Sequence, residues 1–370
     1  MLVSIINPVC GHSDAAQFFA AHVLPLLTPP DLLVVHTTAK GHAETVLRDL
    51  PDPLTVVLCS GDGTLQEIIT ALAPRPVTFV LVPCGTANAL YASLFPPTKD
   101  HDPVDYKLKS LHAFIRKSTP VHLSLASTAL FSPAGSVQAA LSSVVVSTSL
   151  HASILHHSEA LRQSHPGIER FKIAAQQNSS KWYNGRVNLV PPPSLGHVQV
   201  YDPKSNTFVP HTQSTHLDGP FIYFLSTVNV DRLEPEFRIS PLARAIPPPP
   251  STCDIVILRP LRDPSTPEDT PQSRLSFVEK TWKVLGAAYQ DGAHVRLTYN
   301  QDGQILPDGD GPPVIEYFRC AGWEWFPDDQ DQDAHLVCAD GAILHIPEHG
   351  HAVCSVDPFP HGFSVHGSDK

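Results

Sequence analysis

The chain has 370 residues, of which 42% are hydrophobic and 16% are charged, and its formal net charge is −11. This length favours about two domains. The negative charge argues against nucleic acid as a partner, since nucleic-acid binding needs clustered Lys and Arg, and against standing adhesion to an anionic membrane.

The cysteines and the hydropathy pattern indicate the cellular compartment that we expect for this chain. Its seven cysteines include no CxxC pair, so we expect free thiols in a reducing compartment. No stretch approaches the roughly 20 apolar residues of a spanning helix, and the chain opens on a short apolar run without a basic leader. We therefore expect a cytoplasmic protein with no signal peptide or transmembrane segment, and with at most peripheral contact at membranes.

The first part of the chain alternates strand and helix patterns. Short continuous apolar runs predict strands at residues 2–6, 32–36, 54–59 and 77–82. Apolar residues at helical spacing follow each run and predict helices at 14–27, 41–50, 64–72 and 86–94. Buried strands that alternate with helices indicate an α/β domain with a parallel sheet covered on both faces.

The pattern changes near residues 95–120, where prolines interrupt it and one further helix is expected at 106–117. Turn residues then separate short strand-like segments, as in an antiparallel sandwich or barrel. The expected strands are 121–126, 141–148, 186–190, 221–230, 253–258, 294–299, 314–319, 335–339 and 342–346, with helices at 154–163 and 276–285. We expect an α/β domain over residues 1–118 and a β-rich domain over 119–370.

Three polar, proline-containing stretches are expected to be mobile, at residues 191–217, 247–250 and 263–274. The acidic run 328–333 is expected to be a solvated hairpin tip. The histidines show no spaced set with Asp, Glu or Cys, so no group of side chains is predicted to hold a metal ion by itself.

Three glycine-bearing turns follow the first, third and fourth predicted strands. They read Asn7-Pro8-Val9-Cys10-Gly11, Ser60-Gly61-Asp62-Gly63-Thr64 and Pro83-Cys84-Gly85-Thr86-Ala87-Asn88. Glycine lets the backbone approach a ligand closely, and converging N–H groups beside a helix N-terminus form an anion site. Because ligands bind at the carboxyl ends of parallel strands, these turns predict nucleotide binding. No GxxxxGK[ST] or GxGxxG sequence occurs, so a Walker A loop and hydride transfer are not supported.

Asp62 is unusual in a phosphate-binding turn, because phosphate repels a carboxylate. It could hold Mg²⁺ or accept a proton from an attacking hydroxyl, or it could be a turn aspartate that makes an Asx hydrogen bond. Glu67, three residues after Thr64, suits a capping box but could equally reach a metal or a ribose. Asn7 and Asn88 suit turn support as well as nucleotide contacts. The residues alone leave these alternatives open.

Taken together, the turns resemble the catalytic domain of diacylglycerol kinases and their relatives, the sphingosine and ceramide kinases. Ser60 resembles the sphingosine-kinase branch, because diacylglycerol kinases more often carry glycine there. The segment 147–171 extends the resemblance, which implies that Arg162 and Arg170 reach the nucleotide phosphates. Thr38 stands where the family has a nucleotide-contacting threonine. The resemblance implies a Rossmann-like α/β domain of the NAD-kinase and diacylglycerol-kinase type, followed by a mainly antiparallel β-sandwich.

Two positions depart from the family pattern. Asp340-Gly341 is followed by Ala342, where the family usually has a glutamate that assists hydroxyl deprotonation in some relatives. Ser153 stands where sphingosine kinases have an aspartate that engages the lipid head group. A neutral hydroxyl holds an ammonium group less well than a carboxylate does, so the second departure weakens the case for a sphingosine-like amino alcohol.

The resemblance implies an ATP-dependent lipid kinase, with ATP and Mg²⁺ as cofactors, that phosphorylates a hydroxyl of a sphingoid base, ceramide or diacylglycerol. Its partners would be the lipid substrate and, transiently, a membrane surface. Asp62 is the expected catalytic residue and, with Ser153, a substrate contact. The expected nucleotide contacts are Asn7, Gly11, Thr38, Ser60, Gly61, Asp62, Gly63, Thr64, Glu67, Gly85, Thr86, Asn88, Arg162 and Arg170. A pseudokinase, suggested by Ala342, and an NAD kinase are the alternatives. The oligomeric state is not predicted.

Overall fold

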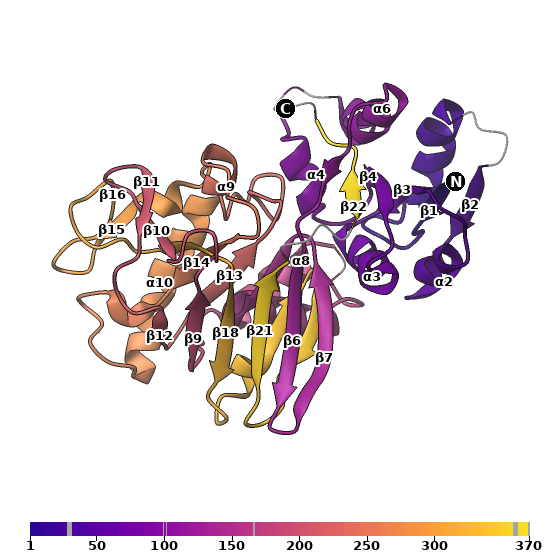
Figure 1. Cartoon of the computed structure of the whole chain (residues 1–370). Coiled ribbons are helices and arrows are strands. Elements are labelled where there is room, and N and C mark those ends of the chain that lie inside the picture. The colour runs from indigo at the N-terminus through magenta and orange to yellow at the C-terminus, as the bar shows by residue number, and fades with distance from the viewer. Residues whose placement is uncertain (28–31, 99, 101, 166, 358–361, 369–370) are drawn as a thin grey trace.

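The computed structural model describes the chain except for residues 28–31, 99, 101, 166, 358–361 and 369–370. A mostly parallel sheet with surrounding helices forms one side of the molecule, and two larger antiparallel sheets form the other (Figure 1). This architecture confirms the predicted fold class.

The four predicted N-terminal strands are present in one sheet. They are β1 (Leu2–Ile6), β2 (Leu33–His36), β3 (Leu54–Ser60) and β4 (Val77–Pro83), and they pair in parallel in the order β2-β1-β3-β4. β22 (Phe363–Val365) continues the sheet in parallel beside β4, and β5 (Val121–His122) closes it in antiparallel. The boundary expected at residues 118 and 119 remains a prediction, and this sheet takes strands from both sides of it.

Helices cover this sheet, with ends that differ from those predicted. They are α2 (His42–Arg48), α3 (Asp62–Leu72), α4 (Ala89–Leu94), α5 (Pro103–Lys107) and α6 (Lys109–Ile115). The single helix predicted at 14–27 is instead α1 (Ala15–Phe18), a π-helical turn (Phe19–Val23) and a 3₁₀ turn (Leu24–Leu26). Pro25 has no N–H to donate, which disfavours a regular α-helix through this point.

α3 begins two residues before the predicted start. Its N-cap is Gly61, which makes no side-chain cap bond. Thr64 therefore lies inside the helix, and the capping box suggested for Thr64 and Glu67 does not form.

The two antiparallel sheets form the predicted sandwich. One has eight strands in the order β11 (Thr207–Pro210), β10 (Gln199–Asp202), β17 (Glu316–Cys320), β14 (Cys253–Leu258), β13 (Tyr223–Thr227), β8 (Val145–Thr148), β19 (Leu336–Ala339) and β20 (Ala342–His345). The other has six, in the order β12 (His216–Asp218), β9 (Gly185–Val190), β18 (Gly322–Pro327), β21 (His351–Val356), β6 (Ala126–Ser132) and β7 (Gly135–Ser142). β15 (Leu297–Tyr299) and β16 (Ile305–Pro307) form a separate pair.

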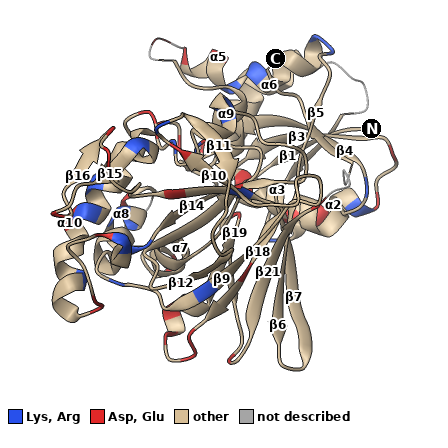
Figure 2. Ribbon diagram, turned by 60° about the vertical axis from the view of Figure 1, so that its left-hand side comes forward, with Lys and Arg blue, Asp and Glu red and all other residues tan. Residues whose placement is uncertain are grey.

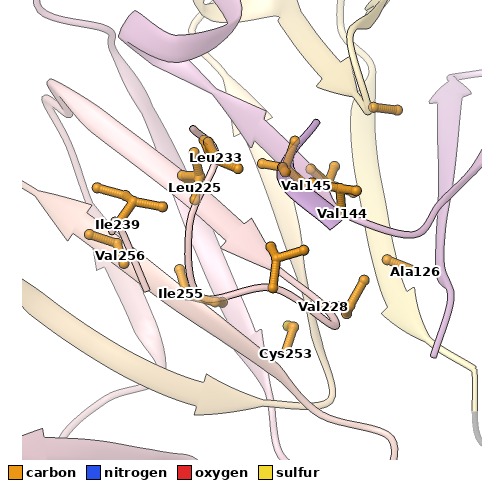
Figure 3. Packing of buried hydrophobic residues seen from close by; sticks show 14 of the residues in the cluster. Ala126, Val144, Val145, Leu225, Val228, Leu233, Ile239, Cys253, Ile255 and Val256 are labelled. Atoms are coloured by element: carbon orange, nitrogen blue, oxygen red, sulfur yellow. The ribbon is translucent and has the colours of Figure 1, made fainter. Parts of the chain in front are cut away.

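Aromatic side chains join the facing surfaces of the sandwich. The ring of Trp323 on β18 lies 5.1 Å from that of Phe224 on β13, and its indole N–H donates to Ser226 Oγ at 3.0 Å. The apolar core continues along β8, β13 and β14, where Val145, Leu225 and Ile255 lie together (Figure 3). This packing holds the strands whose ends and loops reach the site described below.

Helices complete the β-rich part. α7 (Ser149–Ala160) lies against β8, β13 and β19, and α8 (Glu169–Asn178) packs on α7. α9 (Leu242–Ala245) is short, and α10 (Pro271–Ala288) is longer than the predicted 276–285. Further 3₁₀ turns occupy Pro260–Arg262, Ala293–Arg296 and Gln332–His335.

The mobility expected for residues 191–217 is wrong, because β10, β11 and β12 form there. Tyr201 on β10 is buried against Phe208 and Tyr317, with ring centroids 5.8 and 6.4 Å away. A few well-placed aromatic side chains therefore order a segment whose overall composition is polar.

Candidate active site

One cavity connects the glycine turns to the interior of the β-rich part. Its volume is about 1710 Å³. Most of the predicted site residues line it, namely Asn7, Thr38, Gly61, Asp62, Gly63, Thr64, Glu67, Thr86, Asn88, Arg162 and Arg170. Gly11, Ser60, Gly85 and Ser153 do not line it, and Ser153 is fully buried in α7.

The tips of the three turns pack closely against one another beneath this cavity. A Cβ atom on Gly85 would lie 2.6 Å from Gly61 Cα. Gly11 has φ +52°, and a Cβ atom there would lie 2.3 Å from the carbonyl oxygen of Cys84. Only glycine permits this approach of backbone to backbone.

Side chains predicted to touch a nucleotide also hold the turns together. Asn7 Nδ2 donates to Thr64 Oγ1 at 3.3 Å, and Ser60 Oγ donates to the same oxygen at 2.8 Å. Asn88 Oδ1 accepts from Gly85 N–H at 2.9 Å, while its Nδ2 donates to Gly85 O at 2.7 Å. Asn7 and Asn88 therefore support the turns, which is one of the two interpretations that the sequence allowed. Ser60, predicted only as a nucleotide contact, also supports them.

Asp62 links the second turn to the third. Its carboxylate accepts the N–H of Ala89 at 2.6 Å and that of Leu90 at 3.3 Å, which caps the N-terminus of α4. Burial raises the pKa of Asp62, and these two hydrogen bonds oppose the shift. The side chain also lines the cavity, so its capping position leaves it next to whatever the cavity binds.

A second carboxylate, Asp340, faces the same cavity. It accepts backbone N–H groups from Ser143 at 2.6 Å, Val144 at 3.0 Å and Val145 at 2.7 Å. The pKa of Asp340 is raised to about 7, chiefly by burial and also by the nearby negative charge of Asp62, while these hydrogen bonds oppose the shift. Asp340 was expected only as part of the Asp340-Gly341-Ala342 motif and was not predicted to be a site residue. The sequence signal that could have singled it out is its position in a two-residue turn between two apolar strands.

Arg162 and Arg170 bring two positive charges to the cavity. Arg162 Nε pairs with Glu159 Oε1 at 2.7 Å and is largely exposed. Arg170 is 12% exposed, its nearest carboxylate oxygen is 3.5 Å away on Glu159, and its Nε has no hydrogen-bond partner among the residues that the structure describes. Burial, followed by the charge of Arg162, lowers the pKa of Arg170. A half-buried, weakly paired guanidinium beside a second one is suited to hold an anion.

Two other predicted residues lie at the edge of this polar region. Thr38 N–H donates to His42 Nδ1 at 3.1 Å, so the turn before α2 is closed by the histidine side chain. Glu67, on the second turn of α3, is half-buried on the cavity wall. It is placed near the turns, where a metal ion bound to phosphate or a ribose hydroxyl would lie.

Apolar side chains also line the cavity. They come from the β7–β8 connection, α7, the loop after β13, and α10, and include Val144, Val145, Ile154, Leu155, Leu233, Phe237, Trp282 and Leu285. Val144, Val145 and Leu233 belong to the core cluster seen in Figure 3. The contributions of α10 and of the loop after β13 were missed, since residues this far apart in sequence meet only in the folded chain.

The residues present fit a nucleotide phosphate chain, which needs clustered donors and cations. They do not form a complete metal centre, because no group of three or more His, Cys, Asp or Glu among the described residues is arranged to hold an ion. The cavity carboxylates Asp62, Glu67 and Asp340 could hold Mg²⁺ only with phosphate or water oxygens as further ligands.

Comparison with known proteins supports the resemblance. The diacylglycerol kinase catalytic domain family matches residues 1–119. Sphingoid long chain base kinase 5 of Saccharomyces cerevisiae is 34% identical over 101 residues, which are 24% of this chain and 15% of that protein. Human sphingosine kinase 1 is 33% identical over 101 residues, or 24% and 26% of the two chains. Mitochondrial acylglycerol kinase of Xenopus laevis is 30% identical over 102 residues, or 25% and 23%. Each match therefore spans about a quarter or less of the relative.

Solved structures extend the likeness to the whole fold. Crystal structures of diacylglycerol kinase-type proteins from Bacillus anthracis str. Sterne give TM-scores of 0.56 and 0.50 at 13% and 12% identity. The matches cover 99% of this chain and 97% and 96% of those chains. At this identity the comparison shows a shared fold.

The described residues contain no helix long and apolar enough to cross a bilayer. The three turns and the family match concern the same N-terminal segment. The match to the diacylglycerol kinase catalytic domain covers residues 1–119, less than half of the chain, and this segment is similar to that family in the same glycine turns that carried the resemblance.

Proposed function

We propose that the protein is an ATP-dependent lipid kinase that transfers a phosphoryl group to a hydroxyl of a sphingoid base, a ceramide or a diacylglycerol. One observation carries this proposal: a single cavity is lined by the glycine turns, by two arginines and by a set of apolar side chains. A phosphate donor and a long-chain acceptor could occupy this cavity together. We further propose that residues 1–118 bind the nucleotide and that 119–370 supply the lipid-binding walls.

Phosphoryl transfer depends mainly on positioning and charge neutralisation. In our proposal the turns hold the triphosphate through backbone N–H groups, and Arg162 and Arg170 neutralise its charge. Mg²⁺, when bound with the phosphates, would offset further charge, with Asp62 as the carboxylate placed to contact it. Asp62 would orient the acceptor hydroxyl or accept its proton, since its pKa is raised by burial and its carboxylate lines the cavity.

We place this activity in the cytoplasm with transient contact at membrane surfaces. All seven cysteines are free in the structure, which agrees with a reducing compartment. A long-chain acceptor would be held in a membrane, so the protein would have to meet it there.

The substitution Asp62→Asn tests the proposal. It keeps one oxygen that can accept from Ala89 N–H, but it removes the charge and the proton acceptor. We expect phosphate transfer to fall by about a hundredfold or more, while ATP affinity changes little or rises. The assay uses radiolabelled ATP with sphingoid base, ceramide, diacylglycerol and NAD as acceptors.

Asp102→Asn is the matched control. Asp102 also caps a helix, through the N–H groups of Val104 at 2.8 Å and Asp105 at 2.9 Å, but it does not line the cavity. It should lose no activity. Full activity of the Asp62 variant would remove Asp62 from the mechanism, and transfer to NAD alone would identify an NAD kinase.

A pseudokinase is the second candidate, and Ala342 is the observation that favours it. This residue lines the cavity where the family pattern has a glutamate. A pseudokinase would be stabilised thermally by ATP or lipid without turning either over. Phosphate transfer to any lipid in the panel contradicts this alternative.

A further inference from the structure

Three large apolar side chains project from one face of α10 and its C-cap. Leu275 is 62% exposed, Trp282 is 37% exposed and Tyr289 is 49% exposed. They are spaced by seven residues, and an α-helix drifts only about 20° in each such step. The three therefore form a continuous stripe, which we name the α10 stripe.

The α10 stripe leads directly to the cavity. Trp282 and Tyr289 are lining residues of the cavity as well as exposed ones, and so is Ile168 at the start of α8, which is 42% exposed. The ring of Tyr289 lies 4.7 Å from that of Phe237, and its hydroxyl donates to Glu234 Oε2 at 3.0 Å. The exposed apolar surface is thus continuous with the apolar lining of the cavity.

The charges around the stripe do not favour an anionic partner. Figure 2 shows Lys and Arg segments along α10, but each of these cations is engaged. Lys280 pairs with Asp263, Arg274 Nε pairs with Asp269 at 2.6 Å, and Lys283 Nζ donates to Ile305 O at 2.8 Å. Glu279 is exposed between Leu275 and Trp282. Glu279 offsets the charge that Lys283 keeps, and Glu234 adds a negative charge beside Tyr289. The surface around the stripe therefore carries no net positive charge.

We propose that the α10 stripe is the surface through which the protein docks on an uncharged lipid interface, so that a long-chain lipid enters the cavity past Trp282 and Tyr289. Tryptophan and tyrosine favour the membrane–water interface because each combines an apolar ring with a polar group. Leucine beside them adds buried apolar area. This inference rests on the proposed function for the identity of the entering lipid, while the docking itself is independent of catalysis.

The test is flotation of the full chain with phosphatidylcholine vesicles and with vesicles that also contain phosphatidylserine. We expect binding to phosphatidylcholine that is not strengthened by phosphatidylserine. Leu275→Asp should weaken it by about tenfold or more. Leu275 does not line the cavity, so this variant should keep its activity on a short-chain, water-soluble acceptor and its thermal midpoint.

Val137→Asp is the matched control. Val137 is 54% exposed on β7, on the side of the molecule opposite α10 (Figures 1 and 2). This variant carries the same new charge and should bind vesicles like the unmodified chain. Loss of lipid phosphorylation with all acceptors, with vesicle binding intact, would overturn the kinase proposal and leave docking in place.

Three results would overturn the docking proposal. The first is equal vesicle binding by the Leu275 variant and the unmodified chain. The second is binding that requires phosphatidylserine. The third is a dimer of the unmodified chain in sedimentation that the Leu275 variant converts to a monomer, because the stripe would then be covered by a second copy of the chain.

Discussion

Gly85 and Gly63 belong to neighbouring turns, but Gly85 is closely packed against another turn and Gly63 is not. In Gly85→Ala the new Cβ atom would lie 2.6 Å from Gly61 Cα and 2.9 Å from Asn88 Oδ1. Non-bonded carbon atoms prefer about 3.5–4.0 Å, so the two turns must separate by roughly 1 Å. This overpacking should cost about 1–3 kcal/mol of unfolding free energy. A misplacement of about 1 Å can also cost about a hundredfold in rate.

Gly63→Ala is the matched change. A Cβ atom there meets nothing within 4 Å, and the residue lies in the first turn of α3. Alanine should therefore leave stability unchanged or raise it by about 0.5–1 kcal/mol. Because Gly63 lines the cavity, its new methyl group would occupy space that we assign to phosphate, and ATP affinity should fall.

Thermal unfolding and calorimetric titration of ATP separate the two effects. Gly85→Ala should lower the thermal midpoint by about 2–4 °C for each kcal/mol lost, and phosphate transfer should fall with it. Gly63→Ala should lose ATP affinity at an unchanged or higher midpoint. An unchanged midpoint in the first variant would refute the close packing of the turns, and full ATP affinity in the second would refute phosphate binding at this backbone.

Two further predictions concern the ionisable side chains of Arg170 and His294. Arg170→Met should weaken ATP binding in calorimetry by about tenfold or more, as expected for losing a charged hydrogen bond. It should not lower thermal stability, because the Nε of Arg170 is already unpaired among the described residues. Arg186→Met, at an exposed position outside the cavity, should bind ATP normally, whereas normal binding by the Arg170 variant would contradict the anion site. His294 is buried, and burial lowers its pKa to about 4. The unfolded state therefore takes up the proton first as pH falls from about 6.5, so stability should drop between about pH 6.5 and 4, by about 3 kcal/mol in total from this group. His294→Gln should flatten this dependence in urea unfolding, and an unchanged slope would show that other groups cause it.

The N-terminal strands were predictable because continuous apolar runs of this length fit only buried strands between helices. Leu2–Ile6 and Cys253–Leu258 were predicted with the ends that the structure gives them. Patterns failed where one tertiary contact decides the outcome. The strands within residues 191–217 depend on aromatic contacts such as that between Tyr201 and Tyr317, which no local pattern reveals.

The site residues likewise include some that local sequence patterns predict and others that depend on tertiary contacts. The turns were found from glycine and its neighbours, because the chemistry of backbone approach is local. Whether Asn7 and Asn88 support the turns could not be decided before their partners, Thr64 and Gly85, were known. The weak pairing of Arg170 also depends on the packing of α8 against α7. The contributions of α10 and of the loop after β13 to the apolar lining could not be assigned, since both come from distant parts of the chain.

α4 joins the proposed chemistry to the lipid-binding wall. Asp62 caps its first residues, and at its other end Ser93 Oγ accepts from Asp231 N–H at 3.2 Å while Ser93 O accepts from Arg244 at 2.9 Å. Asp231 begins the segment that carries Leu233 and Phe237 into the cavity. One short helix, α4, thus holds both Asp62, which we assign to the acceptor hydroxyl, and the cavity wall that we assign to the hydrocarbon chain of the lipid. Because phosphoryl transfer depends on positioning, a change at Ser93, which contacts neither substrate in our proposal, should alter the rate of transfer more than it alters ATP affinity.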